Sequence, residues 1–470
     1  MTMNTTHRST EGCVEDVRRL LGSNNARLVS IFGSVEENGE NRAHYIVDVN
    51  REYHRVSLPV RGAIPSVVPA ALAANWYERE LHERFGVEIH GHPDLRPLVH
   101  HPRDYRFQEV KGVGVCEVPV GPVHAGIIEP GHFRFSVVGD TVLHLELRHF
   151  FTHKGTEKLF EGAPIMSGPV LAECVSGDNC FAHAVAYCQS VENAFDISVP
   201  PRGRALRLIG LELERLMAHI GDVGALCGDV GCAVPAAYTA RIKEALLQAS
   251  VRFLGTRFWR GVAVPGGVRR DVSTENAMEL GKAVSQAAAD FAEIAQIILD
   301  MPSLQNRFEK TGVVSRNIAR DLAAVGPVAR ASGIKLDVRR DHPYGFYRKI
   351  SVEVPTLRHG DVLARAQIRI EEARVSARLI QDTINELASG IVSVPVPSGG
   401  SAEGFSAVES PRGELLYWIR IRDGNVVRCH IKSPSFQNWP VLPFAMPGNI
   451  IADFPLINKS FNLSYSGCDR

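Results

Sequence analysis

The chain has 470 residues, of which 45% are hydrophobic and 22% are charged, and its 52 Lys and Arg residues are balanced by 52 Asp and Glu residues. This length allows two or three domains with large buried cores, so stability requires neither disulfides nor a structural metal. Balanced charge gives no basic field of the kind that attracts nucleic acid, and we expect no nucleic-acid partner.

The N-terminal sequence and the cysteines indicate the compartment. The first residues, "MTMNTTHRSTEGCVEDVRRLL", contain no apolar core of a signal peptide, and no window approaches the roughly 18 apolar residues of a membrane span. The nine cysteines are odd in number and scattered, which is typical of a cytosolic chain with reduced thiols. We therefore expect a cytoplasmic or peripheral protein that does not cross a membrane itself.

The first hundred residues predict a small domain. Residues 27–60 alternate as strands do, residues 68–87 follow a helical pattern, and residues 90–107 are rich in Pro, His and Gly as an extended tail would be. This composition places a boundary near residues 106–120. We predict a domain over residues 1–108 and a linker over residues 109–120.

From residue 121 onward the sequence predicts a second, mainly helical domain that ends at residue 470. A strand pair is expected around residues 131–148, and long helical periods follow, one of which is expected to end at Gly390. Residues 394–404 read as a loop, and residues 413–432 as a hairpin that turns at Asp423-Gly424. The predicted fold class is α+β, with an N-terminal α/β domain and a large helical domain that carries peripheral β-hairpins.

The stretch "YERELHERFGVEIHGHPDLRPLV" carries the first resemblance to a known family. On composition alone it is a solvated helix followed by a rigid connector. As an ordered stretch it is similar to the signature of the 30-kilodalton subunit of respiratory complex I, although His82 stands where that family prefers Asp. The matching residues are Glu78, Arg79, Glu80, Phe85, Gly86, Gly91, His92, Pro93, Asp94, Leu95 and Arg96.

A second resemblance begins at "GPVHAGIIEPGHFRF" and "THKGTEKLFEG" and continues to the last residue, over about three quarters of the chain. This part resembles the large subunit of group 4 nickel-iron hydrogenases and the 49-kilodalton subunit of complex I. The order of the two modules is that of formate hydrogenlyase large subunits. The resemblance implies a 30-kilodalton-like domain over residues 1–108 and a hydrogenase-like domain over residues 121–470.

The resemblance also identifies where nickel ligands would stand. A nickel-iron centre needs four thiolates, because soft sulfur ligands hold and bridge the two metals. The family supplies them as two C-x-x-C pairs, and those positions here are Ser176, Asn179, Ser464 and Gly467. Cys180 and Cys468 each lie one residue beyond a ligand position, and one residue turns a helical side chain by about 100 degrees. We therefore predict no metal.

Polar residues around these positions are the candidates for remaining chemistry. Glu129 matches a glutamate that carries protons in such hydrogenases, and Arg412 belongs to a Pro-Arg pair that lines their metal pocket. A glutamate that faces an arginine is equally well a structural pair. With Asp178 and Asp469 these two form the predicted catalytic set, and Asn179 and Asn462 complete the polar lining.

The resemblance to complex I makes a quinone a candidate ligand. The histidine and tyrosine that complex I uses fall near Pro130 and on Gly177, so neither is present. His132 and Tyr465 are the expected substitutes, although a lone His is more often a packed core residue. The predicted cofactor-binding residues are His132, Gly177, Asn179, His183 and Tyr465.

Three functions remain open. The favoured one is a metal-free subunit of a membrane-bound, complex I-like complex that passes electrons from NADH or ferredoxin toward a quinone-type acceptor and couples this to ion translocation. The alternatives are a non-redox coupling subunit and an active nickel-iron hydrogenase. The resemblance implies an iron-sulfur small subunit, which would carry the cluster, and membrane-arm subunits as partners. It also implies a location on the inner face of the cell membrane and an inactive isolated chain.

Overall fold

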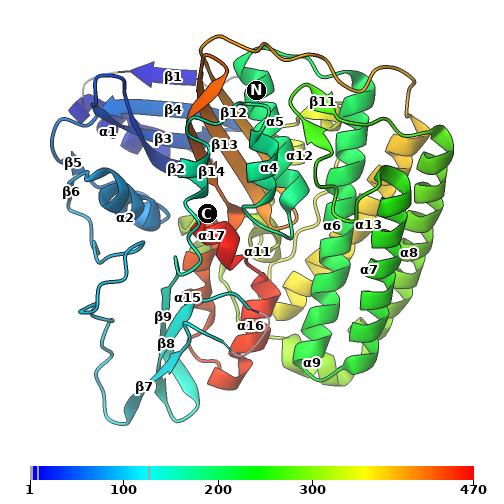
Figure 1. The fold of residues 1–470 in the computed structure, drawn as a ribbon. Helices are drawn as coiled ribbons and strands as arrows, with labels where there is room; N and C mark the ends of the chain where they lie inside the picture. Colours follow the sequence, from blue (N-terminus) through cyan, green and yellow to red (C-terminus); the bar gives the residue numbers. More distant parts are fainter. Residues whose placement is uncertain (1–3, 8–9, 125–127) are drawn as a thin grey trace.

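The computed structural model describes residues 4–7, 10–124 and 128–470. Its N-terminal part is a four-stranded sheet in the order β1-β4-β3-β2 (Figure 1). The strands are β1 Asn4–His7, β2 Ala26–Val35, β3 Asn41–Val49 and β4 Glu52–Pro59. Strands β2, β3 and β4 are antiparallel, and β1 pairs with β4 in parallel. The predicted strands of residues 27–60 are therefore confirmed.

Two helices pack against this sheet, α1 Thr10–Leu21 and α2 Ala74–Phe85. Alternate residues of β2 point to opposite faces, as the pleat requires. A Cβ on Gly33 would lie 2.5 Å from the ring of Phe85 on α2, whereas Phe32 stacks on His430 at 4.2 Å on the other face. Helix α2 begins later than residue 68 and ends at Phe85, where Gly86 follows as the C-cap with a left-handed φ of 64°.

The predicted strand pair around residues 131–148 forms, as β8 His132–Val138 and β9 Thr141–Arg148. A third strand, β7 Val115–Val120, lies within the predicted linker and pairs antiparallel with β8. The short strand pair β5 Ile64–Pro65 and β6 Ile89–His90 brackets α2. The domain boundaries themselves stay a prediction.

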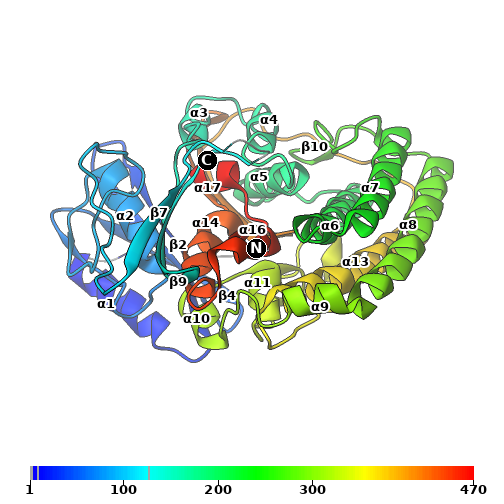
Figure 2. The same ribbon diagram turned by 90° about the horizontal axis from the view of Figure 1, so that it is seen from below.

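The helical body consists of long helices that pack side by side (Figure 2). They are α5 Cys180–Ala194, α6 Pro201–Asp229, α7 Ala233–Leu254, α8 Thr274–Asp300 and α13 Val362–Asn385. Helix α6 lies against both α7 and α13. The helix expected to end at Gly390 ends at Asn385, and the carbonyl of Ala388 beyond it accepts a hydrogen bond from Arg202 at 2.7 Å.

Short elements connect and cover these helices. They are α3 Thr156–Leu159, α4 Gly168–Glu173, β10 Ala263–Val264, β11 Gly267–Val268, α9 Pro302–Phe308, α10 Arg316–Asp321, α11 Gly326–Ala331, α12 Val338–Asp341 and η1 Gly345–Arg348. None of the helices in the described parts of the chain has both the length and the apolarity that crossing a membrane requires.

A three-stranded antiparallel sheet lies at the centre of the molecule. It consists of β12 Ala402–Ser410, β13 Gly413–Arg422 and β14 Asn425–Lys432. The predicted hairpin forms, with positive φ at both Asp423 and Gly424, as a type I′ turn needs. The sheet lies inside the molecule rather than at its periphery, because one face packs on α5 and His430 bonds Ser30 of β2 at 2.8 Å.

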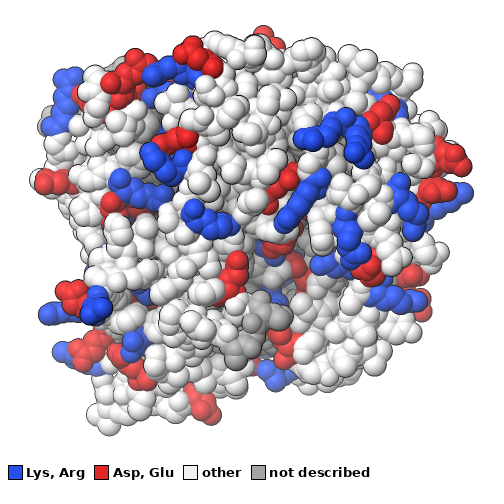
Figure 3. All heavy atoms as spheres, viewed as in Figure 1, with Lys and Arg blue, Asp and Glu red and all other residues white. Residues whose placement is uncertain are grey.

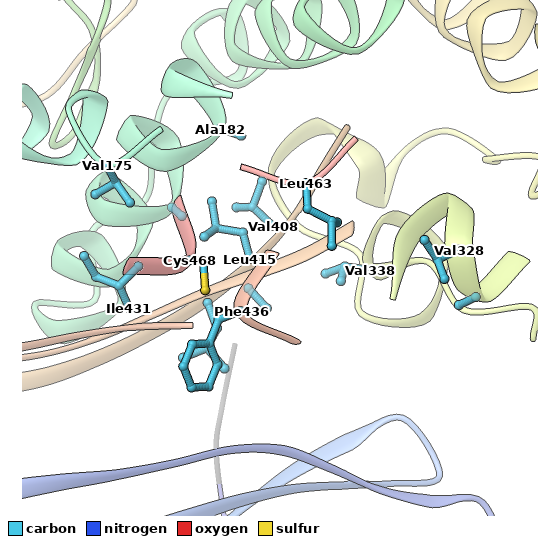
Figure 4. Close-up of a cluster of buried hydrophobic side chains, with 14 of the residues drawn as sticks. Val175, Ala182, Val328, Val338, Val408, Leu415, Ile431, Phe436, Leu463 and Cys468 are labelled. Atoms are coloured by element: carbon cyan, nitrogen blue, oxygen red, sulfur yellow. The ribbon is translucent and has the colours of Figure 1, made fainter. Parts of the chain in front are cut away.

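The C-terminal segment returns to this sheet. It contains α14 Pro434–Asn438, η2 Trp439–Val441, α15 Leu442–Ala445, η3 Ile451–Asp453, α16 Phe454–Phe461 and α17 Tyr465–Asp469. Its last helix sits against buried side chains of the sheet and of the segment before α5, among them Leu415, Ile431 and Val175 (Figure 4). The chain thus ends in the core.

Candidate functional site

The two segments that hold the former ligand positions meet in space. Ser176 lies just before α5, and Ser464 is the N-cap of α17, where its hydroxyl accepts the N–H of Gly467 at 2.8 Å. The hydroxyls of Ser176 and Ser464 are hydrogen-bonded to each other at 3.0 Å. A Cβ on Gly467 would lie 3.3 Å from the Cβ of Ser176. Three of the four positions are therefore in direct contact.

The donor set at these positions does not fit a nickel-iron centre. Hydroxyl and amide oxygens are hard, neutral ligands, whereas bridged nickel and iron need thiolates. Asn179 is buried at 2% exposure, and its Oδ1 has no hydrogen-bond partner among the described residues. In the same part of the chain, no group of three or more His, Cys, Asp and Glu residues is arranged as metal ligands.

The two cysteines next to the ligand positions are buried thiols that contact other groups. Burial raises the pKa of Cys180 to about 12, and its Sγ donates to the carbonyl of Phe258 at 3.3 Å. Cys468 is fully buried, and its sulfur points toward Phe436 in an apolar cluster (Figure 4). Burial also raises the pKa of Cys468 well above its usual value, so neither thiol supplies a thiolate at neutral pH.

The serine pair continues into a chain of polar contacts. Ser176 donates to Asp178 at 2.6 Å, and the other carboxylate oxygen of Asp178 pairs with Arg412 at 2.5 Å. Arg412 also donates to the carbonyl of Asn462, whose side chain donates to Asp222. The structure thus brings together Asp178, Arg412 and Asn462.

Glu129 joins the site at a different point from the one expected. Its carboxylate is exposed and accepts the N–H of Ser466 at 2.8 Å, so its bonded partner is α17 rather than Arg412. Lys154, which sequence reasoning missed, donates to the carbonyls of Cys174 and Val175 at 2.7 and 3.0 Å. Lys154 also donates to the hydroxyl of Ser466, so it ties the two segments together.

Asp469 is buried and holds the loop before α3. Its carboxylate accepts the backbone N–H of Thr152 at 2.9 Å and the hydroxyl of Thr152 at 2.6 Å. Burial raises the pKa of Asp469, while these hydrogen bonds act in the opposite direction. The second carboxylate oxygen is buried without a partner among the described residues.

Two predicted cofactor-binding histidines have structural partners. His132 is hydrogen-bonded to the carbonyl of Gly121 at 3.2 Å, and its ring packs on Phe107. His183 is fully buried on α5 and hydrogen-bonded to the hydroxyl of Tyr417 at 2.8 Å. Burial lowers the pKa of His183 to about 3, so the ring is neutral. Neither of these hydrogen bonds involves Ser176 or Ser464.

Tyr465 and Gly177 border the site. Tyr465 is 6% exposed, its hydroxyl accepts a hydrogen bond from Asn458 at 3.2 Å, and burial raises its pKa to about 12. Its ring packs edge-on against His149, which is buried and was not singled out from the sequence. Gly177 is open, since a Cβ there would meet only Arg260 at 4.0 Å.

Sequence reasoning also missed Glu214 of α6. Its two carboxylate oxygens accept the N–H groups of Phe181 and Ala182 at 2.8 and 3.0 Å, so it caps the N-terminus of α5. Burial raises its pKa to about 8, and the charge of Asp178 acts in the same direction. In the sequence, Glu214 is one residue of a helical pattern, and that pattern does not distinguish it from the other residues of α6.

The last residue connects the site to the N-terminal domain. Arg470 pairs with Glu80 at 2.5 Å and with Glu157 at 3.3 Å, and all three are buried. The charged helix of the first resemblance is therefore partly buried and not solvated. The space-filling view of the same face shows Lys, Arg, Asp and Glu side chains interspersed, and a hollow near the middle, in the region of α17 and α11 (Figure 3).

Together the fold and the site describe a 30-kilodalton-like module packed against a hydrogenase-like large subunit. Comparison with protein families agrees. The model for the respiratory-chain NADH dehydrogenase 30 Kd subunit matches residues 9–110. The model for the 49 Kd subunit of the same enzyme matches residues 229–399 and 393–470.

Curated relatives carry the same pair of modules or the second one. Formate hydrogenlyase subunit 5 of Escherichia coli is 30% identical over 94% of this chain and 84% of its own length. Hydrogenase-4 component G of the same organism is 33% identical over 86% and 76%. NADH-quinone oxidoreductase subunit 4 of Thermus thermophilus is 29% identical over 76% of this chain and 94% of its own length.

Among solved structures, a chain of the archaeal membrane-bound sulfane sulfur reductase matches 79% of this chain and 100% of its own length, with a TM-score of 0.71. At 24% identity it shows the fold alone. The chain belongs to the family of the 49-kilodalton subunit of respiratory-chain NADH dehydrogenase and the related hydrogenase large subunits, with a fused 30-kilodalton module. The predicted fusion is confirmed, and the relatives are subunits of oxidoreductase complexes.

Proposed function

We propose that this chain is a subunit of a membrane-bound, complex I-like complex that passes electrons from NADH or ferredoxin toward a quinone-type acceptor and couples this transfer to ion translocation. The iron-sulfur cluster next to it belongs to a small partner subunit, and other chains form the membrane arm. The chain lies on the inner face of the cell membrane and has no nickel-iron centre of its own.

One observation carries this proposal. The positions where hydrogenases hold their metal have come together as a polar cluster, centred on the hydrogen bond between Ser176 and Ser464 and the ion pair between Asp178 and Arg412. Asp178 is partly exposed, with 41% of its side chain accessible, so its carboxylate can contact a bound acceptor. Fold by itself does not define the reaction, so the proposal rests on this cluster.

The experiment is to purify the complex through a tag on this chain, identify its subunits, and measure reduction of a soluble quinone. We expect Asp178→Ala and Arg412→Ala to abolish quinone reduction without changing subunit composition. Arg374→Ala is the matched control, since it breaks only an exposed ion pair with Glu353 and Glu371. An intact wild-type complex that reduces no quinone would overturn the proposal.

A second candidate function is conformational coupling without redox chemistry. The observation in its favour is that polar contacts run from the site into the helical body: Asp178 binds Arg412, Arg412 binds Asn462, and Asn462 binds Asp222. Asp222 pairs with Arg369 of α13 at 3.0 Å. This function predicts a complex that retains ion transport while it binds no acceptor.

A further inference from the structure

A second buried polar cluster lies between α6, α13, the α11–α12 region and the end of β12. Every member is at most 1% exposed. The cluster contains three guanidinium groups and four carboxylates. They are Arg215, Arg330 and Arg339, and Glu212, Asp337, Glu372 and Glu409.

Three of the four carboxylates are well supplied with donors. The carboxylate of Asp337 accepts hydrogen bonds from Nε and Nη2 of Arg339 at 3.0 and 2.6 Å. The carboxylate of Glu212 accepts hydrogen bonds from Arg339 at 3.0 Å and from the hydroxyls of Tyr347 and Ser376 at 2.5 and 2.6 Å. The carboxylate of Glu372 is hydrogen-bonded to Arg330 at 2.6 Å and to His219 at 2.9 Å. Each of these three is stabilised as a carboxylate.

Glu372 has two hydrogen-bond donors and also the guanidinium of Arg215 at 4.0 Å, whereas Glu409 has two hydrogen-bond donors. Its side chain accepts one guanidinium N–H, from Arg330 at 2.9 Å, and one backbone N–H, from Val338 at 3.0 Å. Arg330 is shared between two carboxylates, because its Nε donates a hydrogen bond to Glu372. With every carboxylate ionised, four negative charges would face three positive charges in a dry interior. One excess buried charge is costly, and the usual response is to bind a proton.

His219 does not supply the missing positive charge. Its Nε2 is hydrogen-bonded to Glu372 at 2.9 Å, but its Nδ1 has no partner among the described residues. A protonated ring would leave a charged N–H buried without an acceptor, and burial lowers the pKa of His219. The ring is therefore neutral.

The neighbouring cluster does not supply a charge either. Glu414 stands directly across from Glu409 on β13, but it is paired with Arg27 at 2.5 Å and Lys432 at 2.6 Å. Arg27 also pairs with Asp48 at 2.8 Å, so two positive and two negative side chains balance there. Arg369, which also interacts with Glu372, is paired with Asp222 at 3.0 Å, so the excess negative charge stays with the cluster that contains Glu409.

A cleft gives this cluster a route to solvent. A hollow of about 120 Å³ is lined by Tyr344 and Tyr347, together with residues of α5, α6 and β12. The hydroxyl of Tyr347 donates to Glu212 at 2.5 Å, and the hydroxyl of Tyr344 accepts the backbone N–H of Glu409 at 3.2 Å. The two tyrosines that line the cleft thus also contact the cluster through their hydroxyls.

We propose that Glu409 is a proton-binding site, at which the buried cluster takes up one proton by way of the cleft lined by Tyr344 and Tyr347. Burial, followed by the charge of Asp337, raises the pKa of Glu409 to about 7, in agreement with this assignment. The site is separate from the serine pair and does not depend on a quinone or any other acceptor.

Glu409 is connected to the candidate functional site through the end of β12. Arg215 holds the carbonyls of Glu409 and Ser410 at 2.6 and 2.9 Å. The hydroxyl of Ser410 accepts the N–H of Arg412 at 3.3 Å, and Arg412 pairs with Asp178. The carboxyl of Glu409 is therefore linked through the end of β12 to the turn that carries Arg412.

The test is infrared difference spectroscopy of the purified complex between pH 6 and pH 8.5, without substrate. We expect the wild type to lose carbonyl bands of protonated carboxyls, and we expect one component, with a midpoint near 7, to be absent from Glu409→Gln. Glu78→Gln and Glu214→Gln are the matched controls, because burial raises the pKa of those groups to about 7 and about 8. Each control should remove its own component and leave that of Glu409.

Two results would overturn the assignment: a wild-type spectrum without such a band, or a Glu409→Gln spectrum identical to the wild type. Should Glu409→Gln not assemble, Glu409→Asp keeps the carboxyl and moves it by one methylene. Its midpoint is then expected to shift, and an unchanged midpoint would count against Glu409. Because no acceptor is present, this result is independent of the outcome of the quinone assay.

Discussion

The hydroxyl of Ser176 is hydrogen-bonded to that of Ser464 at 3.0 Å, across 288 residues of sequence. In a nickel-iron hydrogenase these two positions would hold thiolates on a shared metal pair. Here a direct hydrogen bond joins the two segments, and the cap that Ser464 provides to α17 reinforces it. The contact between the segments is therefore retained with oxygen chemistry.

Replacement of Ser464 tests this contact. Loss of an N-cap hydroxyl costs about 0.5–2 kcal/mol. Ser464→Ala removes the cap and also the bond to Ser176, so we expect a greater loss of unfolding free energy than for Ser273→Ala. Ser273 is the matched control, because it caps α8 through Asn276 at 3.1 Å on the exposed surface. Chemical denaturation measures both, and equal losses would show that the bond to Ser176 contributes nothing.

Replacement of Arg470 tests the connection between the two domains. Arg470→Met leaves Glu80 and Glu157 buried without this partner, and a broken buried pair costs about 3–5 kcal/mol. Although burial alone would raise the pKa of Glu80, Arg470 and Arg84 bring it below its usual value. A depressed carboxyl pKa gives stability above its unfolded value that is lost as the pH falls. The difference in unfolding free energy between the wild type and Arg470→Met should therefore shrink as the pH falls.

The control for this prediction is Arg422→Met. Arg422 pairs with Glu37 where the two side chains are 43% and 76% exposed, so the change should cost less than about 1 kcal/mol. A cost for Arg470→Met as small as that of the control would show that the domain contact does not depend on this ion pair.

Glu214 gives a pH dependence of the opposite sign. Its folded pKa, raised by burial to about 8, lies above its unfolded value, so its contribution to stability is present in acid and is lost as the pH rises through about 8. Each pH unit in that window corresponds to about 1.4 kcal/mol. We expect Glu214→Gln to flatten the fall of unfolding free energy between pH 5 and pH 8.5. A variant curve parallel to the wild type would contradict this.

Gly404 tests how closely β12 approaches α5. A Cβ at Gly404 would lie 1.8 Å from the carbonyl oxygen of Ser190. Gly404→Ala must push the strand from the helix, and overpacking of this kind costs about 1–3 kcal/mol. The matched control is Gly399→Ala, since a Cβ there meets no atom within 4 Å. Thermal unfolding of both variants should show a loss only for Gly404→Ala.

Metal content can be measured directly on the purified complex. The hydroxyl and amide groups of Ser176, Asn179 and Ser464 are poor ligands for nickel, and Gly467 offers no side chain. We therefore expect elemental analysis to find no stoichiometric nickel, while the iron should be accounted for by clusters of partner subunits. Stoichiometric nickel that stays bound after gel filtration would contradict the proposal of a metal-free subunit.

Local sequence was sufficient for most elements and for the loss of the thiols. Periodicity predicted the strands of residues 27–60, the strand pair near residues 131–148 and the long helices, because those patterns report which face of an element is buried. It did not predict β7, which is exposed along much of its length and gains its identity from pairing with β8. Strand pairing is a tertiary property that a short half-exposed segment does not encode.

The candidate site shows the same limit. The sequence located Ser176, Asp178, Arg412, Asn462 and Ser464 as site residues, and the structure brings these five together. The site roles of all the predicted residues remain predictions. His132 and His183, however, have hydrogen-bond partners elsewhere, and Glu129 bonds Ser466 rather than Arg412. Lys154 and Glu214 had no distinguishing pattern, because their importance comes from the backbone groups that they bind.

By itself the sequence determined which atoms are available at the former metal positions: hydroxyl, amide and hydrogen in place of sulfur. Only the tertiary structure decided which charges face each other. Arg412 pairs with Asp178, Arg470 with Glu80, and Glu409 is left with a shared arginine. The physical reason is that the energy of a buried charge depends on its distance from the neighbouring charges. Those distances are set only when the chain folds.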